Sequence, residues 1–416
     1  MEQTGVVLPA GRVTDWISLG VLASWVSRDA VDEAVEETGK AAKRSDGTIP
    51  PHVVVYFVMA LALFADEDYE EVAASLAGVL ADWGAGWEPT SSGLAQARKR
   101  LGPEPMAELF REVARPVAQE DTGGAFFGGW RLMSLDAMVF DVEASKKNLA
   151  EFGLPGTRDG AEAALPQVRA VTVDECTSHA PVLAALGPAG AGKATGEQTL
   201  ARTLYPRFQA DWLVTADRNF YNWADWCAAD DTGAGLLWRV KADLRLPVLA
   251  ELGDHSYLSV LINPDIRGRA RAALLDAARD RRPLEGAKAR YVRVVEYDIP
   301  DREGNGKHEL FALITNILDP RDAPAIPLGG VYQQRWEHET GNKQLKTYLR
   351  GPGRVLRSKS PELVYQEIWG YLLTHFAISA LICTAATAAG IDPDRITFTR
   401  TVRLIRRRAS DPSFSP

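Results

Sequence analysis

Four polar side chains share one segment of the chain at spacings that fit a single helix face: Tyr332, Arg335, Glu339 and Lys346. At about 3.6 residues per turn they fall within roughly 60° of arc, whereas Glu337 points about 160° away from Glu339. On such a face the carboxylate could hold a divalent metal ion, and the two cations could contact phosphates. However, charge pairs three and four residues apart also occur on ordinary solvated helices. Helical geometry alone slightly favours the solvated face.

The spacing Tyr-x2-Arg-x3-Glu-x6-Lys resembles, at every position, the signature of the insertion-element-four family of bacterial DDE transposases. Two other blocks resemble the family's and follow in its order, SLDAMVFDVEASKKNLAEFG (134–153) and LVTADRNFYNW (213–223). The similarity extends over about residues 10–408. It implies a cut-and-paste DNA transposase whose catalytic, metal-binding carboxylates are Asp136, Asp217 and Glu339. Departures from the family pattern leave this triad intact; they are Ala137, Asn219, Glu143-Ala-Ser and Gly341.

The three carboxylates suit a two-metal site. Phosphoryl transfer without a covalent protein intermediate needs two divalent ions about 3.5–4 Å apart. Hard cations take oxygen ligands, so we expect two Mg²⁺ (or Mn²⁺) ions. Asp136 should bridge both ions, and Asp217 and Glu339 should each complete one shell. Three clustered carboxylates would otherwise repel one another strongly.

The resemblance also implies contacts with DNA. Arg335 and Lys346 would grip phosphates beside the scissile bond, and Tyr332 would hydrogen-bond a terminal phosphate. The remaining candidate DNA-binding residues are Arg239, Lys241 and Phe311. The aromatic at Phe311 would stack a flipped base, although a buried strand phenylalanine is the better explanation of that residue.

The implied partners are double-stranded DNA, as terminal inverted repeats and target, and a second copy of the chain in a homodimeric synaptic complex. The implied reaction frees a 3′-hydroxyl at each transposon end, passes through a hairpin and ends in strand transfer. Two rival functions stay open. One is a metal-dependent nuclease on the same core that does not join DNA, and the other is a non-catalytic, domesticated DNA-binding protein.

The apolar pattern predicts helices over residues 12–118 and then strands interleaved with helices, which indicates an α/β layer. Pro89–Ala114 predicts helix, turn, helix, with Arg98, Lys99 and Arg100 ending the first helix. These cations suit DNA and suit the helix dipole equally well. A further helix is expected at about 195–208, and a long one at about 330–349.

The fold class that the resemblance implies is α/β, with an RNase H-like catalytic core (a mixed sheet flanked by helices), a strand-rich insertion and an N-terminal all-helical domain. The expected units are a helical DNA-binding domain (1–122), the core's first part (123–241), the insertion (242–309), the core's second part (310–360) and a C-terminal helical region (361–416).

The net charge of −8 at first argues against nucleic acid. However, the first 80 residues carry 13 acidic and 5 basic side chains, so the rest of the chain is balanced. Six basic residues and no acidic one lie between Thr340 and Pro361. Because phosphate binding depends on local potential, overall acidity does not exclude DNA.

The cysteines and the apolar stretches of the sequence bear on where in the cell the protein is expected. Three scattered cysteines exclude a disulfide scaffold and suit a reducing cytoplasm, and no signal peptide is expected. The stretch Tyr371–Ala389 is near the roughly 20 residues of a membrane span. Because it holds His375 and is rich in Ala and Thr, it predicts a buried core helix. We expect a cytoplasmic protein of the bacterial nucleoid with no membrane partner.

Other polar clusters predict less. GPAGAGKAT (187–195) lacks the Ser or Thr that follows a P-loop lysine, because Ala194 stands there, and it predicts a turn. His338 is expected to face away from Glu339. The Arg-rich run 267–282 could clamp DNA or be a solvated helix. Solvated strand ends are expected for Asp141, Asp174 and Glu175.

Overall fold

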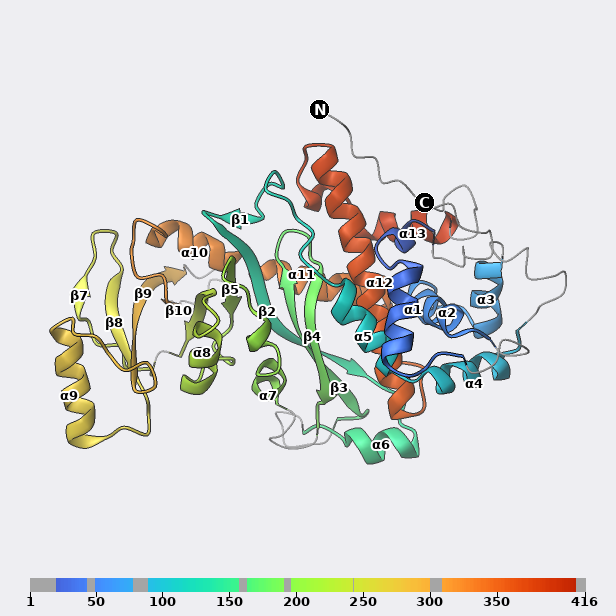
Figure 1. The fold of residues 1–416 in the computed structure, drawn as a ribbon, viewed down its shortest axis with the longest axis horizontal. Helices are drawn as coiled ribbons and strands as arrows, with labels where there is room; N and C mark the ends of the chain where they lie inside the picture. Colours follow the sequence, from blue (N-terminus) through green and yellow to red (C-terminus); the bar gives the residue numbers. More distant parts are fainter. Residues whose placement is uncertain are drawn as a thin grey trace.

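The computed structural model describes residues 20–42, 49–77, 89–156, 163–190, 196–241, 243–299 and 309–408. Helices from the two ends of the chain gather on one side of the molecule, and a long sheet extends away from them (Figure 1). The predicted turn at 187–195 lies partly outside the described residues.

One 10-stranded sheet forms the α/β part, in the order β4-β3-β2-β5-β6-β10-β9-β8-β7, with β1 paired to β2. β2 is antiparallel to β3 and parallel to β5, and β6 continues parallel to β5. β10 is antiparallel to β6. The strands are β1 (Phe126–Phe127), β2 (Trp130–Asp141), β3 (Gln167–Glu175), β4 (Pro181–Pro188), β5 (Trp212–Ala216), β6 (Gly235–Val240), β7 (Ala250–Glu251), β8 (Tyr257–Ile262), β9 (Ala289–Ile299) and β10 (Glu309–Thr315).

Helices cover both faces of this sheet. One face packs on α7 (Glu197–Ala201), the short 3₁₀ turn Tyr205–Arg207 and α8 (Trp223–Asp230). The opposite face packs on α10 (Ala325–Gln333), α11 (Trp336–Lys343), the π-helical turn Gln344–Leu349 and α12 (Pro361–Ala388). β5 is buried throughout, as expected of a central parallel strand covered on both sides.

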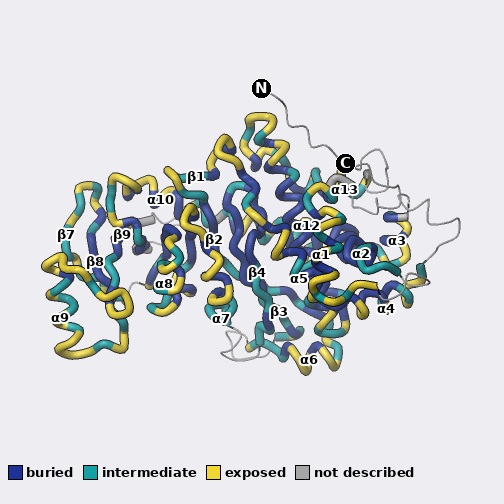
Figure 2. The backbone as a smooth tube through the Cα atoms, in the orientation of Figure 1, coloured by how far each residue is buried: buried dark blue, intermediate teal, exposed yellow. Residues whose placement is uncertain are grey.

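The N-terminal helices form one apolar core with the C-terminal ones. α2 is buried from Val53 through Leu63 and packs along α12 (Figure 2). The described part of the expected C-terminal region, residues 361–408, therefore completes the helical unit of the N-terminus. The other helices of this unit are η2 (Gly20–Ser24), α1 (Arg28–Glu37), α3 (Tyr69–Ala77), α4 (Ser91–Leu101), α5 (Glu104–Val113), η6 (Pro393–Arg395) and α13 (Phe398–Arg408).

α12 is long and apolar enough, by length and composition alone, to cross a membrane. Its most apolar 18-residue window is 78% buried inside the protein. Thr374 donates a hydrogen bond to the carbonyl of Met59, and His375 is buried beside Phe398. α12 is thus the core helix of the helical unit, as its composition predicted.

The described part of the predicted insertion does not build a separate sheet. β9 pairs with β10, and β8 and β7 follow outward, so these strands extend the central sheet. α9 (Gly268–Arg279) covers this end and carries the Arg-rich run. Most residues of α9 are exposed or half-buried, and Ala278 is its one fully buried residue.

Three helix predictions need correction or refinement. The helix–turn–helix is present as α4 and α5, but Arg98 is fully buried and cannot face DNA. The helix expected over 195–208 is only α7 followed by turns. The helix expected over 330–349 is interrupted after Gln333, where hydrogen bonds to the third preceding residue tighten the chain.

Candidate active site

Two aspartates end up side by side because their strands are parallel neighbours. The pairing of β2 with β5 brings Leu135 opposite Ala216. The next positions are Asp136, within β2, and Asp217, directly after β5. Each carboxylate accepts a backbone N–H of the following residue, from Ala137 at 2.8 Å and from Arg218 at 2.7 Å.

The third carboxylate comes from the helix over this edge of the sheet. Glu339 lies in α11, with its side chain 48% exposed. The guanidinium of Arg335 connects it to the strand: Nη1 donates to Asp136 at 3.2 Å, and Nη2 lies 3.7 Å from Glu339. Arg335 is 12% exposed, so this cation lies inside the carboxylate cluster rather than on its rim.

The cluster changes the acidity of its members. Burial raises the pKa of Glu339, and the neighbouring Asp136 and Asp217 raise it further against the lowering effect of Arg335 and His338. Burial lowers the pKa of Arg335, but the surrounding anions outweigh it and the net shift is upward. Arg335 therefore stays positively charged, and its single charge does not neutralise all of the carboxylates around it.

His338 faces away from Glu339, as helix geometry predicted, and anchors α11 in the sheet. Its Nδ1 lies 3.1 Å from the carbonyl of Ser134, and its Nε2 lies 3.2 Å from the hydroxyl of Thr172. It is buried, with Asp174 at 3.6 Å. The residues on either side of this anchor, Glu337 and Glu339, reach different parts of the molecule.

The expectation that Asp174 and Glu175 are solvated is wrong. Both are buried, because β3 is an inner strand that is covered where it ends. Burial raises the pKa of Asp174. Glu175 accepts hydrogen bonds from the backbone of Val117 and Ala118 and pairs with Arg131, so it fastens the linker of the helical unit to the sheet. Asp141 is half-buried.

Glu197 was not among the predicted site residues. It lies in the first turn of α7, 3.7 Å from Arg169. Burial raises its pKa, and the charges of Asp136 and Asp217 add to that rise. This fourth carboxylate near the cluster had no sequence signal, because its short helix carries no motif of its own.

The aromatic candidates form a packed group beside the cluster. Tyr332 is buried, and burial raises the pKa of its hydroxyl. Phe311 is half-buried, stacked on Tyr297 with 5.5 Å between ring centroids, and the Arg239 guanidinium lies 3.7 Å from its ring centre. In this arrangement Phe311 already has π partners, which a stacked base would have to displace.

The two candidate lysines do not join the carboxylates. Lys241 is exposed just beyond the end of β6. Lys346 lies half-buried in the π-helical turn, where burial and Arg350 lower its pKa against the opposing effect of Asp141. Asp141 is five residues beyond Asp136 on β2, about 17 Å at roughly 3.3 Å per residue. Lys346 therefore lies on the surface of the π-helical turn that follows α11, beside the carboxylate site and not within it.

The donor set of the triad fits hard divalent ions, since all three ligands are carboxylates. Among the described residues, a different group has its ligand atoms within 4.8 Å of one another: His179, Glu337 and Asp394. That group faces a cavity of about 440 Å³ on the other side of α11. In the triad the guanidinium of Arg335 lies between Asp136 and Glu339, so metal binding would require Arg335 to move away.

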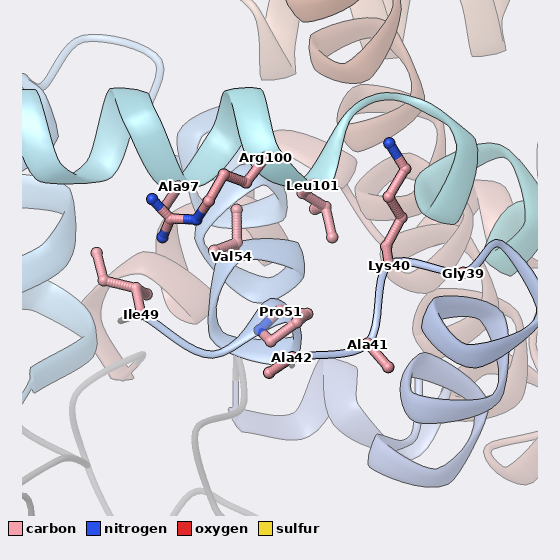
Figure 3. A pocket seen from close by; sticks show the side chains of 10 residues that line it. All are labelled: Gly39, Lys40, Ala41, Ala42, Ile49, Pro51, Val54, Ala97, Arg100 and Leu101. Carbon is pink, nitrogen blue, oxygen red and sulfur yellow. The ribbon is translucent and has the colours of Figure 1, made fainter. Parts of the chain in front are cut away.

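A second cavity, of about 370 Å³, lies in the helical unit between α2, α4 and the chain after α1 (Figure 3). Its lining is mostly apolar, with Lys40 and Arg100 at its sides. None of its lining residues comes from the sheet or from α11. It is therefore separate from the carboxylate site.

Comparison with known proteins finds transposases among the similar proteins. Residues 16–111 match the family model described as insertion element 4 transposase N-terminal. The chain is 26% identical over 394 residues to the transposase InsG of insertion sequence element IS4 from Escherichia coli (strain K12), covering 93% of this chain and 82% of that protein. A weaker likeness, with 10% identity and a TM-score of 0.45, covers 95% of this chain and 80% of the piggyBac transposase chain in a synaptic complex with hairpin DNA.

The match to the N-terminal family model and the likeness to InsG together span both the helical unit and the sheet that carries the carboxylates. Residues 16–111 therefore belong to the insertion element 4 transposase N-terminal family, and the chain as a whole is similar to a transposase of that insertion element.

Proposed function

We propose that this transposase cuts and joins DNA by two-metal-ion phosphoryl transfer, with Asp136, Asp217 and Glu339 as the metal-binding carboxylates. The observation that carries the proposal is the meeting of these three residues. Two adjacent parallel strands supply the aspartates, and Arg335 joins Asp136 to Glu339 from the covering helix. Mg²⁺ or Mn²⁺ would supply Lewis-acid activation of water and of the scissile phosphate.

We also propose that the inner strands form an RNase H-like core. The order β4-β3-β2-β5-β6, antiparallel on one side of β2 and parallel on the other, supports this assignment. In such a core the first aspartate lies mid-sheet on β2 and the second ends the parallel neighbour. The strands between Asp217 and Glu339 are then an insertion that widens the sheet.

The chain's own residues have separable roles in the proposed reaction. In the first step a water oxygen attacks phosphorus, the bond to the 3′-oxygen breaks, and that oxygen leaves as the new 3′-hydroxyl. Arg335 neutralises the carboxylates before loading, and its guanidinium then suits bidentate contact with a phosphate beside the scissile bond. The contacts of His338 with Ser134 and Thr172 fix the rotation of α11 about its axis, so that Glu339 would face the scissile phosphate.

In the later steps that we propose, the 3′-hydroxyl attacks a phosphorus of the opposite strand and displaces the 3′-oxygen of the flanking DNA, which closes a hairpin. Water then attacks the hairpin phosphorus and releases the 3′-hydroxyl again. That hydroxyl finally attacks a phosphorus of the target DNA and displaces a 3′-oxygen of the target strand. Two transposon ends must be held together, so a homodimer on double-stranded DNA in the bacterial cytoplasm is part of the proposal. Tyr332, Arg239, Lys241, Lys346 and Phe311 are its candidate DNA contacts.

The test compares two glutamates on opposite sides of α11. Glu339→Gln should abolish Mg²⁺-dependent cleavage of a plasmid that carries the DNA flanking the gene, while leaving its binding to that DNA measurable. Glu337→Gln is the matched control and should retain cleavage. Asp136→Asn and Asp217→Asn should behave like Glu339→Gln, and cleavage that survives in these variants would refute the assignment.

A second assay separates transposition from its rivals. With pre-cleaved ends and a target plasmid, the wild-type protein should yield joined products. Cleavage without joining would identify a nuclease on the same core. DNA binding without cleavage by the wild-type protein would identify a non-catalytic DNA-binding protein.

A further inference from the structure

Three lysines from distant parts of the sequence meet at the seam between the helical unit and the sheet. Lys99 lies in the last turn of α4, Lys147 lies in α6 (Lys146–Phe152), and Lys359 lies two residues before α12. All three are exposed and line one depression of about 410 Å³. α4 and α6 both contact α12, and the ribbon shows the two helices near each other at one side of the molecule (Figure 1).

A buried hydrogen-bond network fixes this convergence. Each lysine directly follows or precedes a buried polar residue: Arg98, Asn148 and Ser358 respectively. These three anchors meet at Ser358. The amide of Asn148 donates to its carbonyl at 3.0 Å, and the guanidinium of Arg98 donates to its hydroxyl at 3.3 Å.

Further bonds stiffen the same frame. Gln366 of α12 accepts from Arg98 at 2.8 Å and donates to the Arg98 carbonyl at 3.0 Å. Ser145 donates to the carbonyl of Lys359 at 2.7 Å. Glu367 accepts from the backbone of Ser358 at 3.1 Å. The backbone beneath the three lysines is therefore held in place, and their side chains cannot separate by a simple loop movement.

The charges in the depression are unbalanced. Among the described residues, none of the three ammonium groups forms an ion pair with a carboxylate. Glu362 is the acidic residue of the lining, and the others are Ser360 and Leu363. Like charges that a rigid frame holds together repel one another unless an anion binds between them. α12 also begins here without a side-chain cap, and a helix N-terminus favours anions.

We infer that Lys99, Lys147 and Lys359 form a binding site for the phosphodiester backbone of duplex DNA, one that spans the seam between the helical unit and the sheet. This inference rests on the proposed function. The lining has no aromatic side chain to stack a base and one apolar residue, Leu363, so recognition would depend on charge alone. The depression lies where the two parts that such a duplex would contact, the helical unit and the sheet, meet.

The test is the salt dependence of duplex binding. Each phosphate neutralised contributes about −0.9 to the slope of log K against log salt. The variant K99Q/K147Q/K359Q should lower the magnitude of that slope by up to about 2.7 and weaken binding at about 0.1 M salt at least tenfold. The charge-retaining variant K99R/K147R/K359R should keep the wild-type slope.

A matched control removes the same charge elsewhere. R28Q/R111Q/R321Q neutralises three arginines that are already paired with Asp32, Glu108 and Asp319. Its slope should stay within about one unit of the wild-type slope. Thermal unfolding should be unchanged in the lysine variant, because the three anchors are untouched.

Three results would overturn the inference. One is a wild-type slope in the lysine variant, and another is an equal loss of slope in the arginine control. The third is a variant that loses only the binding of inorganic phosphate, which would identify a small-anion site. Failure of the proposed function looks different, because the wild-type protein would then bind DNA through these lysines without Mg²⁺-dependent cleavage.

Discussion

At the scale of single residues, Arg335 is the unusual feature of the site. Two of the carboxylates that we propose as metal ligands, Asp136 and Glu339, are here held together by the guanidinium of Arg335, which contacts both strand and helix. A cation in this position offsets the repulsion between the clustered carboxylates. In the proposed reaction Arg335 would exchange its contacts with the carboxylates for a contact with phosphate, so we expect its loss to affect both the pKa of Glu339 and the rate of cleavage.

Replacing Arg335 with Ala should shift the acidic limb of the cleavage–pH profile to higher pH. Arg335 lowers the pKa of Glu339 against burial and the neighbouring aspartates, so its removal lets that pKa rise further. Cleavage should also slow by roughly a hundredfold, the usual loss for one electrostatic contact to a transition state. Arg335→Lys keeps the charge and should move the limb less. An unchanged limb in Arg335→Ala would contradict this role.

At the scale of elements, the contacts of the buried His338 fix the position of α11 on the sheet, whereas the exposed face of α11 does not. Glu339, the glutamate that we propose as catalytic, is solvent-accessible, whereas the adjacent His338 is buried against β2 and β3. The interruption before α11 and the π-helical turn after it allow this short helix to be oriented independently of α10.

Replacing His338 with Ala should destabilise the protein by about 2–4 kcal/mol, since it opens a cavity and leaves Ser134, Thr172 and Asp174 short of a partner. Thermal unfolding would measure this loss. His338→Gln, which can still reach one of these groups, should lose less. Equal stability of His338→Ala and wild type would show that α11 is held by other contacts.

Two helical glycines test how tightly the helical unit is packed: Gly370 lies against another helix, whereas Gly330 faces open space and serves as the control. A Cβ on Gly370 of α12 would lie 2.7 Å from Cγ1 and 3.0 Å from the carbonyl oxygen of Val58 in α2. Gly370→Ala should therefore cost about 1–3 kcal/mol of stability. Gly330 of α10 has no atom within 4 Å of such a Cβ, so Gly330→Ala should stabilise by about 0.5–1 kcal/mol. Denaturant unfolding of the two variants would contradict this packing if both shifted in the same direction.

At the scale of the whole molecule, the widened sheet supports the helices over the site. Arg293 of β9 is fully buried and pairs with Asp254, whose carboxylate also accepts the N–H of Ala325 at the start of α10. Arg293 further donates to the carbonyl of Ala323. The outer strands therefore fix where α10, and after it α11, begins.

Replacing Asp254 with Asn should cost about 3 kcal/mol near neutral pH, because the buried Arg293 loses its counter-charge. Burial raises the pKa of Asp254, but hydrogen bonds from Ser256 and Ala325 and the charge of Arg293 outweigh it and lower the pKa below 3.8. A carboxyl with a depressed pKa stabilises the fold above its unfolded value and loses that contribution as pH falls through the folded value. The difference in the free energy of unfolding between variant and wild type, measured by chemical denaturation, should be constant above about pH 5 and should shrink below about pH 4. A gap that widens in acid would refute the pairing.

The sequence by itself determined the local features of this protein. Helical spacing put Arg335 and Glu339 on one face and turned His338 away, and the apolar runs around Asp136 and Asp217 indicated strands. The helix–turn–helix at α4 and α5 and the buried nature of α12 also followed from the sequence, because these properties depend on residues within a few turns of one another.

Only the tertiary structure decided the rest, because it depends on which distant segments become neighbours. Burial of Arg98, Asp174 and Glu175 follows from the elements that cover them, not from their own segments. Strand order placed Asp136 beside Asp217, and the return of α12 to the N-terminal helices brought three lysines to one seam. Periodicity describes one element at a time, whereas charge clusters of this kind form between elements.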